Sequence, residues 1–415
     1  MNRVILHADC NSFYVSCEVC YRPELRGLPV VVGGDPEARH GIVLAKSDAA
    51  KAAGIKTGHV LWQAKSLCKD LIILPPDYRK YLRFSKMTRE IFGDYSDRVE
   101  PFGLDEAWID VSGSSTTIED GERIAHALRE RIKEELGITV SVGVGDNKIM
   151  AKLGSDMKKP DAVTVVHPDH YTDQVWPLPV GELLYVGPAT ETKLKRLGLY
   201  TIGDLARMQP HDIHGILGKN GVMLWSFANG LDQSPVSTTG YAPDIKSIGN
   251  STTTPADMVC DEDVMRTIWV LSEAVAERLR EHGFRARTVQ ISVRDNALKS
   301  YERQIKLKRP TQIAAELARA SMSLFRANHR WDTDKALRSI GVRGADLETD
   351  TGAVQLSLFA EEIKREKTER IEHAMDEVRK RFGHFAMMRG SLLKEPVGRI
   401  NPKEDHTIHP VSFLR

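Results

Sequence analysis

Two adjacent acidic residues inside an apolar stretch constrain the fold of this chain more than any other feature. Asp105 and Glu106 stand between Leu104 and the run 107–109, Ala-Trp-Ile. Like charges in apolar surroundings are costly unless a cation neutralises them. A solvated turn between two strands is an equally good interpretation of the pair taken alone.

A third carboxylate, Asp9, ends the first apolar run, residues 4–8, which predicts a buried strand. Three carboxylates that meet at one sheet edge form a hard oxygen site, the kind that holds Mg²⁺ beside phosphates. The alternative to the solvated turn therefore depends on whether Asp9 lies close to Asp105 and Glu106.

The order of the predicted elements answers that question. The hydrophobic spacing predicts a strand at 3–8, a helix at 80–92, strands at 98–103 and 107–112, a helix at 124–137 and a strand at 139–144. This β-α-β-β-α-β order is that of the ferredoxin-like fold. In that fold Asp9 and the Asp105-Glu106 turn fall on neighbouring strands, so we expect the three carboxylates to meet.

Size and composition point to several domains in a reducing compartment. The chain has 415 residues, which is too long for one core, and roughly two to four domains are expected. It has no apolar run long enough to cross a bilayer, and we expect no secretory leader because the first residues lead directly into a predicted strand. Its five cysteines lack a disulfide spacing. We therefore expect a cytoplasmic protein without a membrane partner.

A basic stretch suggests a polyanionic partner although the net charge is only +1. Residues 285–309 contain eight lysines and arginines against two acidic residues. They alternate with apolar residues such as Val289 and Ile291, which predicts a sheet packed on one face and electropositive on the other. The sheet falls in an α+β unit at 244–345, after a linker at 236–243. An ordinary solvated sheet face remains the alternative.

Two other segments carry weaker signals for DNA and partner binding. Around Gly187 the pattern is that of a helix-hairpin-helix, whose turn aims backbone N–H groups at a phosphate, and Lys193 favours DNA over an ordinary helix connection. In the tail, residues 355–359 place leucine and phenylalanine in polar surroundings, which is typical of docking to a partner. The helix expected at 361–382 carries an apolar face with Ile371, Met375, Val378 and Phe382, so we expect that face to pack.

An ordered set of motifs resembles the Y-family translesion DNA polymerases of the bacterial DNA polymerase IV/UmuC type. The motifs are Asp-Cys-Asn-Ser-Phe-Tyr at 9–14, Gly41 to Gly58, Asp-Glu-Ala at 105–107, Ser141 to Lys148, Ala-Lys-Leu at 151–153 and Asp-Met-Lys-Lys-Pro at 156–160. The resemblance implies an α+β multidomain fold shaped like a right hand. Its parts would be a ferredoxin-like palm (1–10 and 77–165), small fingers (11–76), a helical thumb with the helix-hairpin-helix (166–235), the linker (236–243), a little finger (244–345) and a tail (346–415).

The resemblance also implies catalytic roles. Asp9 and Asp105 would bind two Mg²⁺ ions per active site, Glu106 would complete one ion site, and the Cys10 backbone carbonyl would add an oxygen. These ions would serve nucleotidyl transfer from a dNTP to a primer 3′-hydroxyl.

For substrate binding, the resemblance implies that Tyr14 is a steric gate that excludes a sugar 2′-hydroxyl and that Phe13 lies beside the incoming sugar. Lys159 would contact the triphosphate. The fingers depart from the family pattern. Ala45, Asp48 and Lys51 stand where the commoner set is Thr, Tyr and Arg. Lysine lacks the bidentate fork of arginine, so we expect weak triphosphate binding unless Lys46 compensates.

The implied macromolecular partners are primer–template DNA and the bacterial sliding clamp. The residues assigned to DNA are Gly187, Lys193, Arg285, Arg287, Arg294 and Arg303, and those assigned to the clamp are Gln355, Leu356, Leu358 and Phe359. The function expected is low-fidelity translesion synthesis by a monomer recruited to the nucleoid during repair. A catalytically weak DNA- and clamp-binding accessory factor and, more distantly, a nucleotide cyclase are the alternatives.

Overall fold

The computed structural model describes residues 3–35, 41–241, 244–350, 360–393 and 395–402. Most of the chain falls into two compact units, one made of Met1–Gly34 and Ile42–Ala242, the other of Pro243–Ile408. The boundary between the units therefore lies within the predicted linker, 236–243. No helix in the described part of the chain is both long and apolar enough to cross a membrane.

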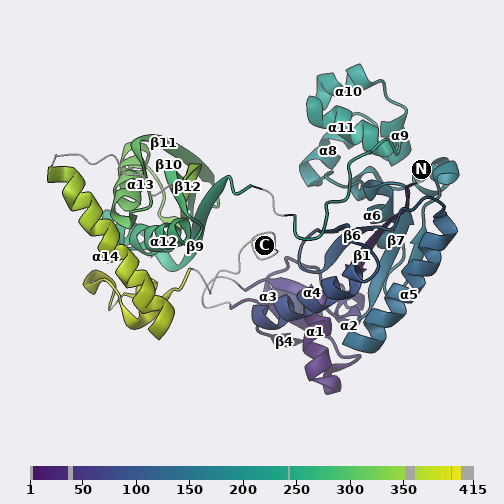
Figure 1. The fold of residues 1–415 in the computed structure, drawn as a ribbon, viewed down its shortest axis with the longest axis horizontal. Coiled ribbons are helices and arrows are strands. Elements are labelled where there is room, and N and C mark those ends of the chain that lie inside the picture. Colours follow the sequence, from purple (N-terminus) through teal and green to yellow (C-terminus); the bar gives the residue numbers. More distant parts are fainter. Residues whose placement is uncertain (1–2, 36–40, 242–243, 351–359, 394, 403–415) are drawn as a thin grey trace. The chain divides into compact units, whose positions relative to one another are not determined.

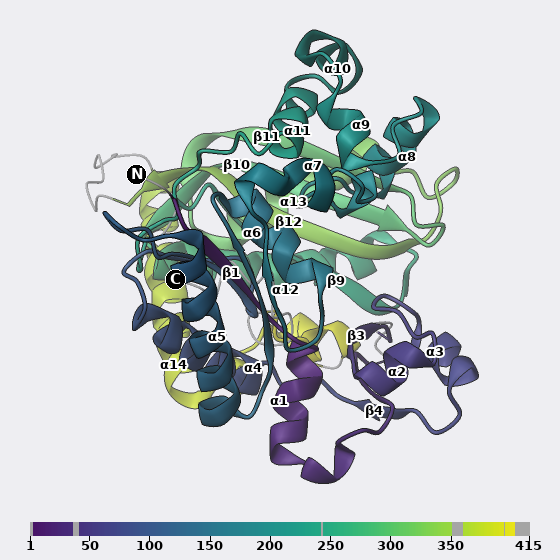
Figure 2. The same cartoon turned by 90° about the vertical axis from the view of Figure 1, so that its right-hand side faces the viewer.

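The first unit is built on a five-stranded sheet of order β5-β6-β1-β7-β8. Its first four strands have the ferredoxin-like order, and β1 runs antiparallel to both β6 and β7. Helices α4 and α5 cover one face and α6 covers the other (Figure 1 and Figure 2). The bounds are β1 Ile5–Cys10, α4 Tyr78–Gly93, β5 Val99–Pro101, β6 Glu106–Asp110, α5 Ile118–Leu136, β7 Val140–Gly145, α6 Lys148–Met157 and β8 Val163–Val165.

Local sequence explains where these elements begin and end. Thr117 and Asp120 form a capping box that starts α5, and Gly137 stops it with a left-handed φ of 69°. The alternation in β1 sends Leu6 and Ala8 into the core under α4 and α5. The other face of the strand is left for α6 and the polar side chains.

Two smaller assemblies complete the first unit. A three-stranded sheet of order β3-β2-β4 carries short helices between residues 13 and 74. Its elements are α1 Phe13–Tyr21, η1 Pro23–Leu25, β2 Val30–Gly33, β3 Val43–Lys46, α2 Asp48–Ala52, α3 Leu61–Leu67 and β4 Ile72–Leu74. A helical group with its own core follows. Its elements are η2 Pro168–His170, α7 Tyr171–Gln174, η3 Val180–Glu182, α8 Pro188–Arg196, α9 Ile202–Ala206, α10 Pro210–Leu217 and α11 Lys219–Ala228.

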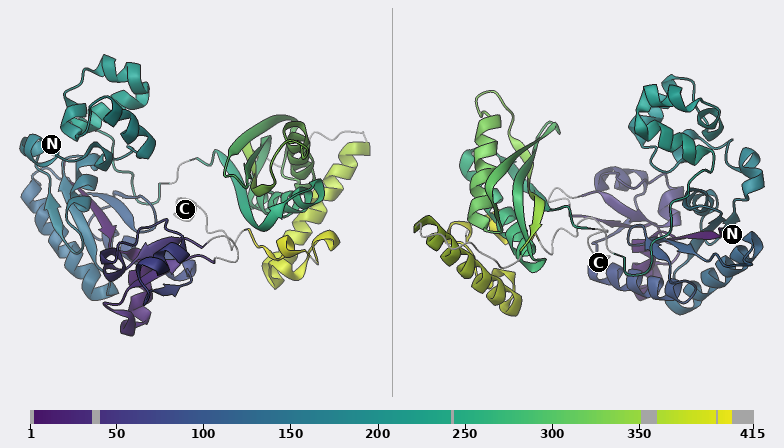
Figure 3. Two further views of the ribbon diagram at one scale, coloured as in Figure 1. Left: turned by 180° about the vertical axis from the view of Figure 1, so that it is seen from behind. Right: turned by 45° about the horizontal axis from the view of Figure 1, so that its top comes forward.

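The second unit is a four-stranded antiparallel sheet of order β11-β10-β12-β9. Helices α12 and α13 pack on one face of the sheet (Figure 3). The bounds are β9 Ser247–Met258, α12 Asp261–Glu281, β10 Phe284–Asp295, β11 Ser300–Thr311, α13 Ala314–Asn328 and β12 Leu337–Thr349. The mixed α+β class expected from the sequence is confirmed, whereas the palm, fingers, thumb and little-finger boundaries stay predictions.

One basic residue lies on the opposite face of this sheet from that expected. Arg303 pairs directly with the buried Ile291, and its Nε donates to Asn328 Oδ1 of α13 at 2.9 Å. Directly paired residues share a face of the sheet, so Arg303 lies on the helix-covered side. The expectation that the basic residues all share the open face is wrong here because β11 is an edge strand, where even the helix side reaches solvent.

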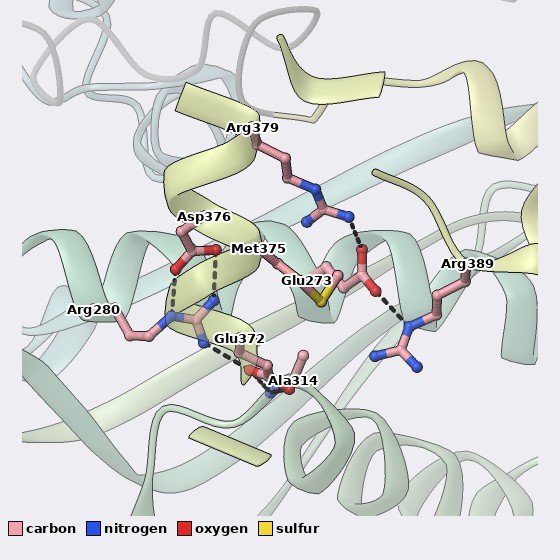
Figure 4. Close-up of a pocket in the computed structure, with 8 residues that line it drawn as sticks. All are labelled: Glu273, Arg280, Ala314, Glu372, Met375, Asp376, Arg379 and Arg389. Atoms are coloured by element: carbon pink, nitrogen blue, oxygen red, sulfur yellow. Dashed lines mark hydrogen bonds and ion pairs between the residues drawn. The ribbon is translucent and has the colours of Figure 1, made fainter. Parts of the chain in front are cut away.

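The tail helix, α14 (Ala360–Phe382), attaches to the second unit through charged side chains (Figure 4). Arg280 of α12 contacts Glu372 at 2.7 Å and Asp376 at 2.6 Å, and Glu273 contacts Arg379 at 2.7 Å. These residues surround a cavity of only about 10 Å³. The short turns after the helix are η4 His384–Ala386, η5 Gly390–Leu392 and η6 Pro396–Arg399.

The expectation that the apolar face of the tail helix packs is wrong for two of its residues. Ile371 is 51% exposed and Phe382 is 68% exposed. The ion pairs with α12 determine which side of the helix faces that helix and leave these two residues exposed, whereas Met375 and Val378 of the same predicted face are partly buried and Met375 lines the cavity.

Candidate active site

The three predicted carboxylates lie at one edge of the five-stranded sheet. β1 and β6 pair with Asp9 directly opposite Glu106, and the Cys10 N–H donates to the Asp105 carbonyl at 2.9 Å. Asp9 is buried and Glu106 is partly buried. The prediction that Asp9 and the Asp105-Glu106 pair occupy neighbouring strands is confirmed.

Two lysines reach into this carboxylate edge from α6 and the loop after it. Lys152 Nζ lies 3.2 Å from Asp9 Oδ2, 2.8 Å from Glu106 Oε2 and 3.1 Å from Asp156 Oδ2. Lys159 Nζ lies 2.8 Å from Asp9 Oδ2 and 2.9 Å from Asp156 Oδ1. Sequence reasoning assigned Lys159 to this site but gave Lys152 no role, although Asp156 four residues later on the same helix was a signal for it.

The pKa values of the acidic pair move in opposite directions. Burial, then repulsion from Glu106 and Asp9, raises the pKa of Asp105 to about 7. Burial alone would also raise the pKa of Glu106, but His7 and Lys152 outweigh it and lower this pKa to about 2. Asp105 therefore carries the uncompensated negative charge of the site.

The donor set fits a divalent cation. Asp9, Asp105 and Glu106 are hard oxygen donors, and a cation beside Asp105 would relieve the repulsion that raises its pKa. Within the described ranges, no three His, Cys, Asp or Glu side chains form a ready-made metal cluster. Asp9 and Glu106 each turn an oxygen to Lys152 instead. The Cys10 carbonyl remains a predicted ligand.

The predicted steric gate belongs to a cluster of aromatic rings. Tyr14 stacks on Tyr81 with ring centroids 4.4 Å apart and planes 14° apart, and Tyr78 contacts it edge-on at 5.9 Å. Tyr81 Oη in turn donates to Glu18 Oε1 at 3.0 Å. Phe13, beside Tyr14 on α1, is buried in the core. These ring contacts fix the orientation of the Tyr14 side chain.

The predicted triphosphate lysines of the fingers lie near each other. Lys46 ends β3 and donates to Thr57 Oγ1 at 3.2 Å, while Lys51 lies on α2. Burial, and then the charge of Lys51, lowers the pKa of Lys46. Asp48 begins α2 and is exposed. Triphosphate binding by these residues stays a prediction.

Several residues predicted to bind DNA already have partners within the protein. Lys193 Nζ donates to the Ile216 carbonyl at 2.6 Å, and Arg285 contacts Glu369 at 2.7 Å and Asp350 at 3.2 Å. Arg287 pairs with Glu348. Gly187 caps the N-terminus of α8 and Arg294 lies on the open face of the sheet opposite Ser300. The predicted clamp-binding residues Gln355, Leu356, Leu358 and Phe359 lie outside the described residues.

Comparison with known proteins establishes the family. Residues 8–156 match the impB/mucB/samB family, and residues 245–358 match the impB/mucB/samB family C-terminal domain. The chain belongs to the Y-family of DNA polymerases. The resemblance seen in its motifs and the prediction of a DNA-directed DNA polymerase are thereby confirmed.

Relatives match this polymerase along nearly its whole length. DNA polymerase IV of Acetivibrio thermocellus is 50% identical over 395 residues, which cover 95% of this chain and 98% of the relative. DNA polymerase IV 1 of Bacillus subtilis is 36% identical over 398 residues, with 95% and 94% covered. A solved Y-family DNA polymerase chimera, Dbh-Dpo4(243-245)-Dbh, superposes with a TM-score of 0.74 at 22% identity. The match covers 83% of this chain and 99% of the chimera, and it supports the fold.

Proposed function

We propose that this polymerase carries out low-fidelity, template-directed translesion synthesis with two Mg²⁺ ions per active site. The observation that carries the proposal is the meeting of Asp9, Asp105 and Glu106 at one sheet edge, beside Lys152 and Lys159. The three carboxylates, with the Cys10 carbonyl, would hold the ions. Bound there, Mg²⁺ supplies Lewis-acid activation of the primer 3′-hydroxyl and neutralises charge on the leaving pyrophosphate.

The remaining chemistry is positioning by the protein's own side chains. Lys159, and Lys46 with Lys51 from the fingers, would bind the triphosphate of the dNTP. Tyr14 would exclude a ribose 2′-hydroxyl, and Phe13 would pack beside the incoming sugar. The stacking of Tyr14 on Tyr81 supports a gate role because a gate must resist displacement by the sugar.

Low fidelity is supported by the small size of the fingers. In the described residues, the segment between α1 and α4 contains a three-stranded sheet, the turn η1 and the short helices α2 and α3, with five and seven residues. So small an assembly can scarcely enclose the nascent base pair. A loosely enclosed pair is checked less strictly for shape, and a damaged template base is tolerated.

Primer–template DNA would be held by the helix-hairpin-helix around Gly187 and Lys193 and by the basic residues of the second unit, Arg285, Arg287, Arg294 and Arg303. The sliding clamp would bind residues 355–359. The enzyme would act as a monomer in the cytoplasm and reach the nucleoid when clamp and damaged template are present together.

Primer extension tests the catalytic assignment. With a primer–template, Mg²⁺ and dNTPs, the wild type should add nucleotides, including opposite a template lesion. Asp105→Asn and Glu106→Gln should abolish extension while leaving primer–template binding nearly intact, and Asp70→Asn at an exposed position is the matched control. Extension by both active-site variants would contradict the assignment. Failure of the wild type to extend would favour the accessory-factor alternative.

A further inference from the structure

A buried carboxylate lies one helical turn after the proposed steric gate. Glu18 and Tyr14 are both on α1 and are four residues apart, so their side chains leave the helix on the same face. Glu18 is only 2% exposed and is not one of the proposed metal ligands. A buried charge is costly unless partners compensate it, so the contacts that Glu18 makes are informative.

Two side chains of α4 satisfy this carboxylate. Lys80 Nζ donates to Glu18 Oε2 at 2.6 Å, and Tyr81 Oη donates to Glu18 Oε1 at 3.0 Å. Asp77 caps the start of α4 by accepting the Lys80 N–H, so the turn that carries both donors is itself fixed. Each oxygen of Glu18 therefore has its own partner, and the hydroxyl end of Tyr81 is held in place.

The ring of the same tyrosine lies against the gate. Tyr81 is fully buried and stacks on the partly buried Tyr14, with ring centroids 4.4 Å apart and planes 14° apart. Tyr78, one turn earlier on α4, contacts both rings edge-on, at 5.9 Å from Tyr14 and 5.8 Å from Tyr81. Movement of the Tyr14 ring would therefore break a stacked pair or disturb a hydrogen bond to a buried charge.

We propose that Tyr81, anchored by Glu18, is a positioning residue for Tyr14 and thereby determines how strictly ribonucleoside triphosphates are excluded. The inference rests on the proposed polymerase function and on the gate role of Tyr14. A gate excludes a 2′-hydroxyl only while its ring stays in place, because a ring that can tilt makes room for one more oxygen atom. Loss of the Tyr81 ring should therefore change sugar selectivity.

Three substitutions separate positioning of the gate from a general contribution to folding. Tyr81→Leu removes the stacked ring, whereas Tyr81→Phe keeps the ring and removes only its hydrogen bond to Glu18. Phe84→Leu is the matched control. Phe84 is a buried residue of the same helix, and its ring contacts Tyr21 of α1, with centroids 6.2 Å apart.

Sugar selectivity is measured as the kcat/KM for a ribonucleotide divided by the kcat/KM for the matching deoxyribonucleotide, in single-nucleotide extension. We expect Tyr81→Leu to raise this ratio about fivefold, which converts to ~1 kcal/mol, the size of one stacked aromatic pair. Tyr81→Phe should raise it less. Phe84→Leu should lower the free energy of unfolding and leave the ratio unchanged. In a Tyr14→Ala background, Tyr81→Leu should no longer alter the ratio, because its effect passes through the gate.

An unchanged ratio in Tyr81→Leu, or the same rise in the Tyr14→Ala background, would overturn the proposal. A wild-type ratio in Tyr81→Phe would overturn the part assigned to Glu18. Denaturant unfolding shows which variants fold, and Tyr81→Phe still tests the proposal if Tyr81→Leu does not fold. Failure of the gate is distinguishable, because Tyr14→Ala alone would then leave the ratio unchanged. Failure of the proposed function is distinguishable too, because the wild type itself would then not extend primers.

Discussion

At the scale of single residues, the charged form of Asp105 is destabilised by the active site around it. Its pKa is raised from 3.8 to about 7, chiefly by burial and then by Glu106 and Asp9. Between these two values the folded protein keeps a proton that the unfolded chain releases, so stability falls as the pH rises through this window. Glu106 acts in the opposite sense, since its pKa is lowered from 4.5 to about 2 and its contribution is lost as the pH falls through that range.

Replacing Asp105 should therefore stabilise the metal-free protein at alkaline pH. Asp105→Asn removes the buried charge, and we expect a gain of up to about 4 kcal/mol at pH 8 that shrinks toward zero near pH 4. Chemical denaturation in a chelator across that pH range measures the gain, with Asp70→Asn as the exposed control. A gain that does not depend on pH would show that the charge of Asp105 is not its cause.

Tyr14 gives a second prediction at the residue scale. Tyr14→Ala removes the ring that is stacked on Tyr81, so we expect at least about a tenfold rise in ribonucleotide incorporation relative to deoxyribonucleotide incorporation, which corresponds to 1.4 kcal/mol of lost discrimination. Single-nucleotide kinetics with each nucleotide measure the ratio. Tyr14→Phe keeps the ring and should behave like the wild type. An unchanged ratio in Tyr14→Ala would remove this residue from the gate role.

At the scale of secondary-structure elements, the site depends on how closely α6 lies over the sheet. A side chain added at Gly143 of β7 would overlap the Ala151 carbonyl and the backbone of Ser155 on α6. Both contacts are with backbone, so the helix could not yield without moving as a whole. The absence of a side chain at Gly143 therefore lets α6 bring Lys152 to Asp9 and Glu106.

Gly143→Ala should displace α6 from the sheet. We expect a loss of about 3 kcal/mol or more in the free energy of unfolding, the upper part of the range for overpacking, together with strongly reduced primer extension. Denaturant unfolding and extension assays measure both effects. Gly93→Ala, where an added side chain meets nothing within 4 Å, is the control. Wild-type stability in Gly143→Ala would mean that α6 can lie further from β7 without cost.

The ion pairs that attach α14 to α12 give a second prediction at the scale of secondary-structure elements. Arg280→Ala leaves Glu372 and Asp376 without their buried partner, and breaking such a pair costs about 3–5 kcal/mol. We expect faster tryptic cleavage within residues 360–402 while the sheet of the second unit stays intact, as read by mass spectrometry. Arg319→Ala, at an exposed position on α13, should leave the cleavage rate unchanged. A rate unchanged in Arg280→Ala would show that the ion pairs do not hold the helix.

At the scale of the whole molecule, the predicted clamp peptide lies in the sequence between β12 and α14, both elements of the second unit. Burying Leu358 and Phe359 in a partner cleft would yield a few kcal/mol before ordering costs, roughly 1.5–3 for each side chain. Such binding is modest, so simultaneous attachment to DNA would raise the effective affinity.

Loss of both apolar side chains should abolish recruitment without harming the enzyme. With Leu358→Ala and Phe359→Ala combined, we expect stimulation of synthesis by a bacterial sliding clamp to disappear while clamp-free extension stays at the wild-type rate. Processivity assays with and without the clamp measure this. Ser357→Ala in the same peptide is the matched control, and continued stimulation of the double variant would contradict the assignment of the peptide.

Local patterns were enough to predict most elements of both units. The period-four spacing from Ile124 to Leu136 and the stop at Gly137 predicted α5 to within a few residues at its C-terminal end, but missed its start because Ile118–Arg123 is mostly polar. The alternation of β10 was visible in the same way, whereas the face occupied by Arg303 was not. The face on which the Arg303 side chain lies depends on strand register and on the edge position of β11, and the pattern of a single strand contains neither.

The sequence by itself determined the ferredoxin-like order of elements, the pairing of Asp9 with the Asp105-Glu106 strand and the family, because periodicity and ordered motifs are properties of the chain. Only the tertiary structure decided that Lys152 and His7 surround Glu106 and that α14 docks by its charged side. These contacts join residues far apart in the chain. Their partners are selected by packing distance and by the cost of leaving a buried charge unpaired.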